Sequence, residues 1–153
     1  MKLVFVESEK HLTSIRELFL EYAESLGFSL CFQNFDKELA NLPGDYSPPD
    51  GRLILALDEN KPIGCVALRK LEKHICEMKR LYIKPEMRGI GLGEQLVRTV
   101  IDEAVKIGYM KMRLDTVPKM KEAIDLYSKI GFKEVGPYRE NPIEGAMYME
   151  MDL

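Results

Sequence analysis

The fold of this chain is decided by the stretch Arg88-Gly89-Ile90-Gly91-Leu92-Gly93. It follows an apolar, strand-like run that ends at Ile83 and precedes an amphipathic helical pattern over residues 93–106. Alternate glycines let the backbone turn tightly, and the helix that begins there points its unpaired N–H groups and the positive end of its dipole at the turn. The stretch therefore predicts a site for a phosphate or pyrophosphate group.

Length and composition indicate one folded domain over residues 1–153. Hydrophobic residues make up 46% of the chain and charged residues 31%, which argues against disorder. The three cysteines, Cys31, Cys65 and Cys76, are too few and too scattered for a disulfide framework. They are interpreted as reduced thiols of a cytoplasmic protein.

Charge and hydropathy limit the classes of partner. The net charge of −3 lacks the basic excess of a nucleic-acid-binding protein, and no apolar run is long enough to span a membrane. A weakly acidic surface is compatible with a cationic amine as substrate but does not require one. We therefore expect no nucleic acid and no membrane among the partners.

The remaining chain has the pattern of a mixed α/β fold with a meander of strands in its middle. A helix is predicted from Ser8, its N-cap, to Gly27, its stop, and others over residues 36–42, 93–106 and 119–129. Strands are predicted over residues 3–6, 52–57, 63–68, 75–83, 110–114, 132–135 and 146–152.

Two familiar phosphate motifs can be compared with the glycine stretch. A Walker loop requires Lys and then Ser or Thr after its last glycine, whereas Glu94-Gln95 follow here. A dinucleotide fingerprint would gain support from Asp115, which follows about 20 residues later. However, Glu94 stands where that fingerprint needs its third glycine, and the stretch comes after several strands instead of the first. Both observations argue against a dehydrogenase.

The glycine stretch resembles the acyl-CoA signature of the Gcn5-related N-acetyltransferase (GNAT) superfamily, in which Arg88, Gly91 and Gly93 fill the defining positions. The strand and proline before it, Leu81-Tyr82-Ile83-Lys84-Pro85, are usual in that superfamily. Leu126-Tyr127-Ser128-Lys129-Ile130-Gly131-Phe132 resembles its second hallmark, a helix ending in Tyr followed by Gly-Phe. The resemblance covers most of the chain, and residues 26–46 are similar to an uncharacterised bacterial branch of the superfamily. It implies a mixed, mostly antiparallel sheet of six to seven strands with helices on both faces.

The resemblance also implies a cofactor and its contacts. Acetyl-CoA would be the co-substrate, with its pyrophosphate held by backbone groups of the glycine stretch and its pantetheine arm lined by N–H groups along the preceding strand. Met120 stands where the superfamily often has an Asn that contacts this arm, so one side-chain contact is changed. The expected cofactor-binding residues are Leu81, Tyr82, Ile83, Arg88, Gly89, Ile90, Gly91, Leu92, Gly93, Glu94 and Met120.

Two residues are catalytic candidates by the same resemblance. Tyr127 would protonate or orient the departing sulfur; its alternative is a tyrosine of the core. Glu77 stands 11 residues before Arg88, the spacing of the general base in the histone-acetylating branch. Strand alternation places Glu77, Lys79 and Leu81 on one face. The alternative for Glu77 is a solvated carboxylate paired with Lys79 or Arg80, and a water chain is the other candidate base.

Other chemistry-bearing residues give no second site. His11 and His74 have no partner at metal-ligand spacing, so we expect no metal. A covalent route through Cys76 is conceivable, but an isolated cysteine in a strand is more often a buried hydrophobe, and direct attack is preferred.

The sequence thus predicts an enzyme that transfers an acetyl group to a primary amine, through a ternary complex. The alternative is a non-catalytic acyl-CoA-binding sensor, against which Tyr127 and Glu77 argue. Residues 32–46 and 138–144 are the expected walls of the acceptor site, because both are irregular and mix polar with aromatic side chains. The identity of the acceptor stays open, as does the oligomeric state, a homodimer included.

Overall fold

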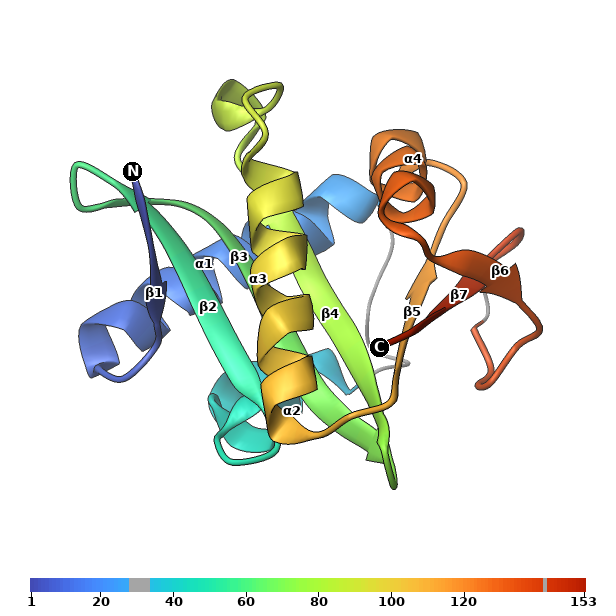
Figure 1. Cartoon of the computed structure of the whole chain (residues 1–153). Helices are drawn as coiled ribbons and strands as arrows, with labels where there is room; N and C mark the ends of the chain where they lie inside the picture. Colours follow the sequence, from blue (N-terminus) through green and yellow to red (C-terminus); the bar gives the residue numbers. More distant parts are fainter. Residues whose placement is uncertain (28–33, 142) are drawn as a thin grey trace.

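The computed structural model describes residues 1–27, 34–141 and 143–153. Some of the predictions concern residues outside these ranges. They are Cys31; Phe32 and Gln33 of the expected acceptor wall 32–46; and Pro142 of the expected wall 138–144. Figure 1 shows a central sheet with helices on either side. None of the helices within the described ranges is long and apolar enough to cross a membrane.

The sheet has seven strands in the order β1-β2-β3-β4-β5-β7-β6. All neighbouring strands are antiparallel except β4 and β5, which are parallel. The predicted fold class, a mixed and mostly antiparallel sheet with helices on both faces, is confirmed. The strands are Lys2–Phe5 (β1), Arg52–Asp58 (β2), Lys61–Glu72 (β3), Ile75–Ile83 (β4), Lys111–Thr116 (β5), Lys133–Val135 (β6) and Met147–Asp152 (β7).

The helices begin and end where local backbone chemistry allows. Ser8 caps the first helix by accepting a hydrogen bond from the His11 N–H at 3.2 Å, and Gly27 ends it in the left-handed conformation, as predicted. The α-helices are Glu9–Leu26 (α1), Phe35–Ala40 (α2), Leu92–Ile107 (α3) and Lys121–Ile130 (α4), and single 3₁₀ turns cover Gly44–Tyr46 (η2) and Pro85–Met87 (η3).

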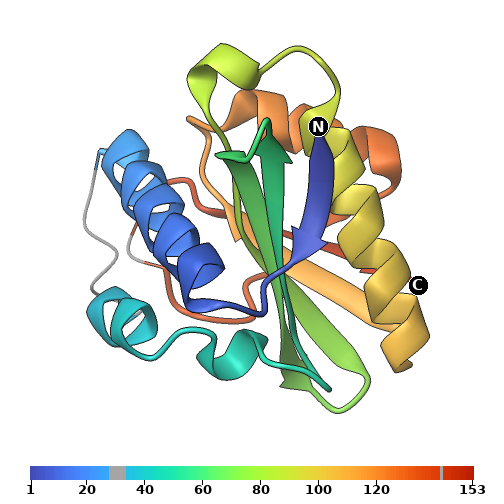
Figure 2. The same cartoon turned by 90° about the vertical axis from the view of Figure 1, so that its left-hand side faces the viewer.

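The helices cover the sheet from two sides (Figures 1 and 2). One core packs α3 and α4 on the sheet, with Val97 and Val100 of α3 fully buried. The other packs α1 and α2 on the opposite face, with Ile15 and Phe19 of α1 fully buried. Burial of an apolar side chain of this size contributes about 1.5–3 kcal/mol, so the two cores hold the sheet between them.

The sheet splays in its middle, between the two parallel strands. Backbone pairing of β4 with β5 covers only Ile75–Glu77 against Lys111–Arg113. From there on β4 stays with β3 and β5 stays with β7, so the two strands diverge (Figure 1). The edge of β4 that faces β5 is consequently open from Met78 onward.

A bulge in β4 changes which side chains face which way. Cys65 of β3 stands opposite Tyr82 and Ala67 stands opposite Lys79, so two residues of β4, Arg80 and Leu81, oppose one residue of β3. Arg80 has a left-handed φ of 61°. Because an extra residue inverts the alternation beyond it, the bulge turns the following side chains to the other face.

The expectation that Leu81 shares a face with Glu77 and Lys79 is therefore wrong. Leu81 packs against the α3 core together with Met78. Simple alternation holds for Glu77 and Lys79 but fails beyond Arg80, because a bulge has no signature in the pattern of apolar residues.

Candidate active site

The glycine stretch forms a turn that borders open space in front of α3. Gly89 and Gly91 have φ values of 83° and 85°, a region that L side chains rarely adopt. The first hydrogen bond of α3 runs from the Gln95 N–H to the Gly91 carbonyl at 3.1 Å. The N–H groups of Leu92 and Gly93 precede that bond and are left for a ligand.

The space in front of this turn suits an anion. A Cβ atom built on Gly89 or Gly91 meets no heavy atom within 4 Å, so both glycines border open space. Arg88 lies beside the turn, where its Nε donates to the Ile83 carbonyl at 2.9 Å and its guanidinium lies 5.7 Å from the Tyr82 ring. This contact ties the turn to the end of β4.

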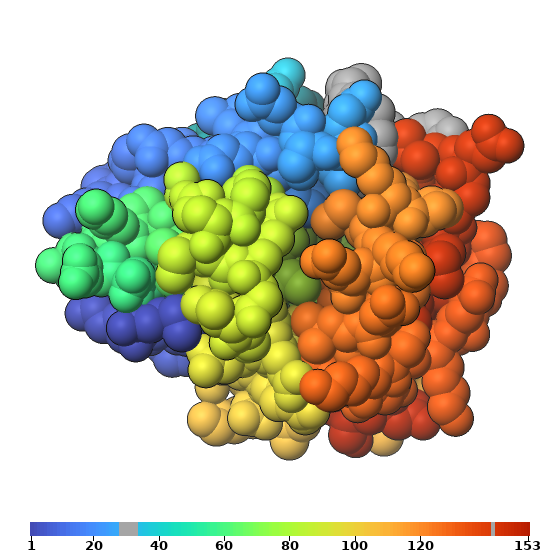
Figure 3. Space-filling model, turned by 90° about the horizontal axis from the view of Figure 1, so that it is seen from above, coloured from blue at the N-terminus to red at the C-terminus, as the bar shows by residue number. Residues whose placement is uncertain are grey.

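A groove of about 620 Å³ runs from the turn along the open edge of β4 to α4. Figure 3 shows this hollow between the segment after β4, in yellow-green, and the α4 region, in orange. The groove contains ten of the eleven expected cofactor-binding residues: Leu81, Tyr82, Ile83, Arg88, Gly89, Gly91, Leu92, Gly93, Glu94 and Met120.

Two of the expected cofactor residues, Ile90 and Glu94, differ in setting from the others. Ile90 does not line the groove, and its side chain is 55% exposed. Glu94 lines it, but its carboxylate accepts hydrogen bonds from Lys129 at 2.8 Å and from Arg98 at 2.9 Å. These two bonds lower the pKa of Glu94 and offset its negative charge beside the glycine turn.

A second, inner hollow of about 50 Å³ lies where β4 and β5 diverge. It shares Leu81 and Met120 with the groove, and Tyr127 of α4 lines it. Tyr127 is buried, its ring packs edge-on against Phe132 at 5.8 Å, and burial raises the pKa of its phenol. Within the part of the chain that the structure describes, no hydrogen bond occupies its hydroxyl. Tyr127 is thus a core residue that lines the inner hollow next to the groove.

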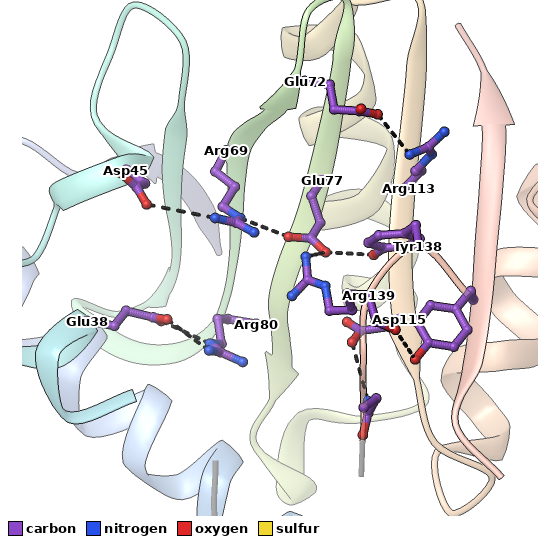
Figure 4. Close-up of polar contacts among 12 residues, drawn as sticks. Glu38, Asp45, Arg69, Glu72, Glu77, Arg80, Arg113, Asp115, Tyr138 and Arg139 are labelled. Atoms are coloured by element: carbon purple, nitrogen blue, oxygen red, sulfur yellow. Dashed lines mark hydrogen bonds and ion pairs between the residues drawn. The ribbon is translucent and has the colours of Figure 1, made fainter. Parts of the chain in front are cut away.

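Glu77 lies at the centre of a buried ionic cluster (Figure 4). One carboxylate oxygen accepts from Arg69 Nε at 2.8 Å, and the other accepts from Tyr138 at 2.6 Å and from Arg139. The side chain of Glu77 is fully buried. The alternative of a solvated carboxylate is therefore wrong, because Glu77 is fully buried and its carboxylate accepts hydrogen bonds from Arg69, Tyr138 and Arg139.

The cluster determines the charge state of Glu77. Burial by itself would raise the pKa of Glu77, but the charges of Lys79 and Arg139, helped by the Tyr138 hydroxyl, outweigh burial and hold it below its ordinary value. A carboxylate with a lowered pKa and bonds on both oxygens is better suited to anchoring arginines than to accepting a proton. The assignment of Glu77 as general base stays a prediction.

Two further cations of β4 lie next to this cluster. Arg80, placed by the bulge, is 4% exposed and forms a bidentate ion pair with Glu38 of α2 at 2.8 and 2.9 Å. Lys79 is 8% exposed, and burial, followed by the charge of Arg80, lowers its pKa to about 8. Neither role could be derived from the sequence, because the partner of Arg80 and the burial of Lys79 come from distant segments.

A third, outer hollow of about 450 Å³ lies beyond Lys79, which it shares with the inner hollow. Both segments expected to form acceptor-site walls contribute to it. Residues from Asn34 to Tyr46 form one side, and Arg139 and Glu140 form part of the other. Arg69 of β3 also lines it, a residue that sequence reasoning missed because nothing in its local pattern marks it.

The remaining candidates form no second centre. Within residues 1–27, 34–141 and 143–153 there is no cluster of His, Cys, Asp and Glu that could hold a metal. Cys76 is fully buried, its Sγ donates to the Lys111 carbonyl at 3.4 Å, and burial raises its pKa to about 12. A thiol in this state is a poor nucleophile.

A splayed mixed sheet with a glycine turn at a helix N-terminus and a groove along the open strand edge is the architecture of an acyl-CoA N-acyltransferase. The acetyltransferase (GNAT) family model matches residues 12–132. The chain belongs to this family, whose members use acetyl-CoA, and it is therefore an N-acetyltransferase.

Relatives and solved structures agree with this assignment. An uncharacterized N-acetyltransferase of Schizosaccharomyces pombe is 41% identical over 150 residues, covering 97% of this chain and 92% of the relative. One of Dictyostelium discoideum is 30% identical and covers 93% of this chain and 94% of the relative. Both come from eukaryotes, so the likeness is not confined to bacteria. The PaiA N-acetyltransferase of Thermoplasma acidophilum, crystallised with coenzyme A, has the same fold, with a TM-score of 0.74, 21% identity and full coverage of both chains.

Proposed function

We propose that the protein transfers an acetyl group from acetyl-CoA to a primary amine by direct attack in a ternary complex. One observation carries this proposal. The groove shares Leu81 and Met120 with the inner hollow, and the inner hollow shares Lys79 with the outer hollow. A donor that enters along the groove and an acceptor that enters from the outer hollow can therefore meet beside Tyr127.

The donor end of this path fits coenzyme A. The N–H groups of the glycine turn would hold the pyrophosphate, and the open edge of β4 at Leu81–Ile83 would supply N–H groups along the pantetheine arm. An N–H group of this edge would also polarise the acetyl carbonyl. In the transfer the amine nitrogen attacks the thioester carbonyl, a C–N bond forms, and the C–S bond breaks.

Tyr127 would act on the departing sulfur. Burial raises the pKa of its phenol, so the hydroxyl keeps its proton at neutral pH. A phenol in this state can donate a hydrogen bond to the sulfur and protonate it as the C–S bond breaks. We therefore propose Tyr127 as the general acid.

The acceptor must lose a proton before or during attack. An alkylammonium has a pKa of about 10.4, so exposing its lone pair at pH 7 costs roughly 4–5 kcal/mol. The cations Arg69, Lys79 and Arg139 on the outer hollow disfavour a further positive charge, which lowers this cost. The proton would leave through water or to Glu77, the two bases that the sequence leaves open.

Titration calorimetry with acetyl-CoA, with NAD as the control ligand, tests the donor end. Release of coenzyme A in the presence of a panel of primary amines then tests transfer. Saturable binding of acetyl-CoA alone, followed by turnover with an amine, is expected. Binding without turnover by any amine would instead indicate a non-catalytic acyl-CoA sensor, and failure to bind would refute the assignment of the glycine turn.

A further inference from the structure

The outer hollow differs in charge from the molecule as a whole. The chain has a net charge of −3, yet three cations, Arg69, Lys79 and Arg139, line this hollow with at most about a quarter of each side chain exposed. These three surround one buried carboxylate, that of Glu77. The interior of the hollow is therefore positively charged.

The carboxylates that also line the hollow do not offset this charge. Glu38 is bound to the buried Arg80 in a bidentate ion pair. Asp45 is 82% exposed and lies 3.8 Å from Arg69, and Glu140 is exposed. Exposed carboxylates interact weakly across water, whereas charges in the half-buried interior are poorly screened.

The two arginines keep hydrogen-bond donors for a ligand. Arg69 uses its Nε on Glu77, and Arg139 uses one terminal nitrogen on the same carboxylate. A guanidinium has five N–H donors, so most of the donors on each side chain remain after these bonds. Glu77 contacts both arginines (Figure 4) and fixes their side chains, which line the hollow. Two preorganised guanidinium groups are well suited to a planar carboxylate, which they bind in bidentate fashion.

The size of the hollow limits the kind of acceptor. Its volume of about 450 Å³ lies in the range of small-molecule sites, which is about 300–1,000 Å³. Lys79 separates it from the inner hollow, where transfer is proposed. An acceptor held by its carboxylate at the arginines can thus direct its amine past Lys79 towards the donor.

We propose that the acceptor is a small amine that carries a carboxylate, and that Arg69 and Arg139 bind this carboxylate. The inference rests on the proposed function, because it names the substrate class of the same transfer reaction. It reverses the weak preference for a purely cationic amine that the overall charge of the chain suggests.

Matched pairs of acceptors test the proposal. Each of the standard L-amino acids, and β-alanine, is compared with its own carboxamide, and kcat/KM is measured from the release of coenzyme A. The carboxamide is the intrinsically more reactive member at neutral pH, because its amine is the less basic of the two. We expect at least one free acid to be acetylated at least about tenfold faster than its amide, which intrinsic reactivity cannot produce.

Variants assign this preference to the two arginines. Arg139→Gln and Arg69→Gln are expected to lower kcat/KM for the acid about 10- to 100-fold and to change the value for the amide little. Arg139→Lys and Arg69→Lys keep the positive charge but lose the planar guanidinium that binds a carboxylate in bidentate fashion. We therefore expect intermediate losses of kcat/KM for the acid. The readout is the acid-to-amide ratio, which a general loss of folding does not move.

Arg113→Gln is the matched control. Arg113 is exposed to a similar extent and pairs with Glu72 and Glu150, but it does not line the hollow. We expect its acid-to-amide ratio to equal that of the parent protein.

The possible results separate the two proposals. Equal or faster acetylation of the amides, or of amines without a carboxylate, would overturn the carboxylate proposal and leave the acetyltransferase intact. An unchanged ratio in both Arg→Gln variants would overturn the role of the arginines. Binding of acetyl-CoA with no acetylation of any amine, acid or amide, would overturn the proposed function and this inference with it.

Discussion

The groove and the outer hollow lie at opposite ends of one path but are built from different materials. Apart from Ser25 of α1, the groove is formed by two continuous stretches, residues 81–94 and 119–126, which contribute the glycine turn together with apolar and charged side chains. The outer hollow is formed by charged side chains from β3, β4, the α2–η2 region and the segment around Arg139. A site made by local backbone can be recognised in a sequence, whereas a site made by converging side chains cannot.

The largest effect is expected for acetyl-CoA binding, from a substitution in the glycine turn at the groove. Gly91→Val places a β-branched side chain at φ 85° with its Cβ in the space for the anion, so we expect acetyl-CoA affinity to fall at least about 100-fold. Gly108→Val is the matched control, because Gly108 also has a positive φ of 111° with open space around it but ends α3 at its other end. Calorimetry that shows both variants with equal affinity would contradict the assignment of the turn.

The next largest effect is expected for the stability of the fold, from a substitution of Glu77 beside the outer hollow. Glu77→Gln leaves Arg69 and Arg139 without their shared carboxylate, and removal of one partner of a buried pair costs about 3–5 kcal/mol. The pKa of Glu77 is lowered in the folded state, so its contribution to stability is present above the unfolded pKa and is lost as the pH falls through the folded pKa. We expect stability to fall less between about pH 5 and about pH 3 in the variant than in the parent.

Urea unfolding across this pH range measures that difference. Glu103→Gln is the control, because Glu103 also has a lowered pKa but pairs with Arg52 and Lys106, away from the three hollows. Glu103→Gln is expected to lower the free energy of unfolding by about 1 kcal/mol or less, as for other ion pairs near the surface. Identical pH dependence in the parent and in Glu77→Gln would show that the cluster does not stabilise the fold.

The third effect concerns the hollow between the two ends. Tyr127→Phe removes the proposed proton donor and keeps the ring, so kcat is expected to fall about 100-fold while acetyl-CoA affinity changes little. Tyr109→Phe removes another mostly buried hydroxyl, one bound to the Asp50 carbonyl at 2.7 Å and remote from the groove. Steady-state rates and calorimetry measure both variants. An unchanged kcat in Tyr127→Phe would remove Tyr127 from the mechanism.

The smallest effect is expected for acetyl-CoA affinity, from a substitution of Met120 where the groove meets the inner hollow. Met120→Asn restores the amide that the superfamily often has there, and one net hydrogen bond is worth about 0.5–1.5 kcal/mol. We expect acetyl-CoA to bind about two- to tenfold more tightly, by calorimetry. Met87→Asn places the same amide elsewhere on the groove and should give no gain. Equal or weaker binding by Met120→Asn would mean that this position does not contact the pantetheine arm.

Most of the fold could be predicted because its signals are local. Ser8 and Gly27 bound the first helix, and the apolar spacing of residues 93–106 marks the second long helix, because caps and periodicity act within a few residues. The bulge at Arg80 could not be predicted, because its left-handed φ depends on pairing with β3 and is not favoured by an arginine.

In the candidate site, too, the features encoded by neighbouring residues could be predicted and those formed by distant residues could not. The glycine turn is predicted from the spacing of its glycines and Tyr127 from the resemblance to the GNAT superfamily, and the structure brings them to adjoining hollows. The cluster around Glu77 was not found, since Arg69 and Arg139 lie 8 and 62 residues away from it. Segment 138–144 was expected at the acceptor wall only from its mixed composition.

The sequence by itself determined the family, the order of the elements and the glycine turn at the N-terminus of α3, because each depends on backbone geometry encoded by neighbouring residues. Only the tertiary structure decided the burial of Lys79, the partner of Arg80 and the basic interior of the outer hollow. These depend on which charges the folded chain brings together and removes from water, and net charge does not report their placement. An acidic protein can for this reason have a positively charged hollow at the place where we propose that the acceptor binds.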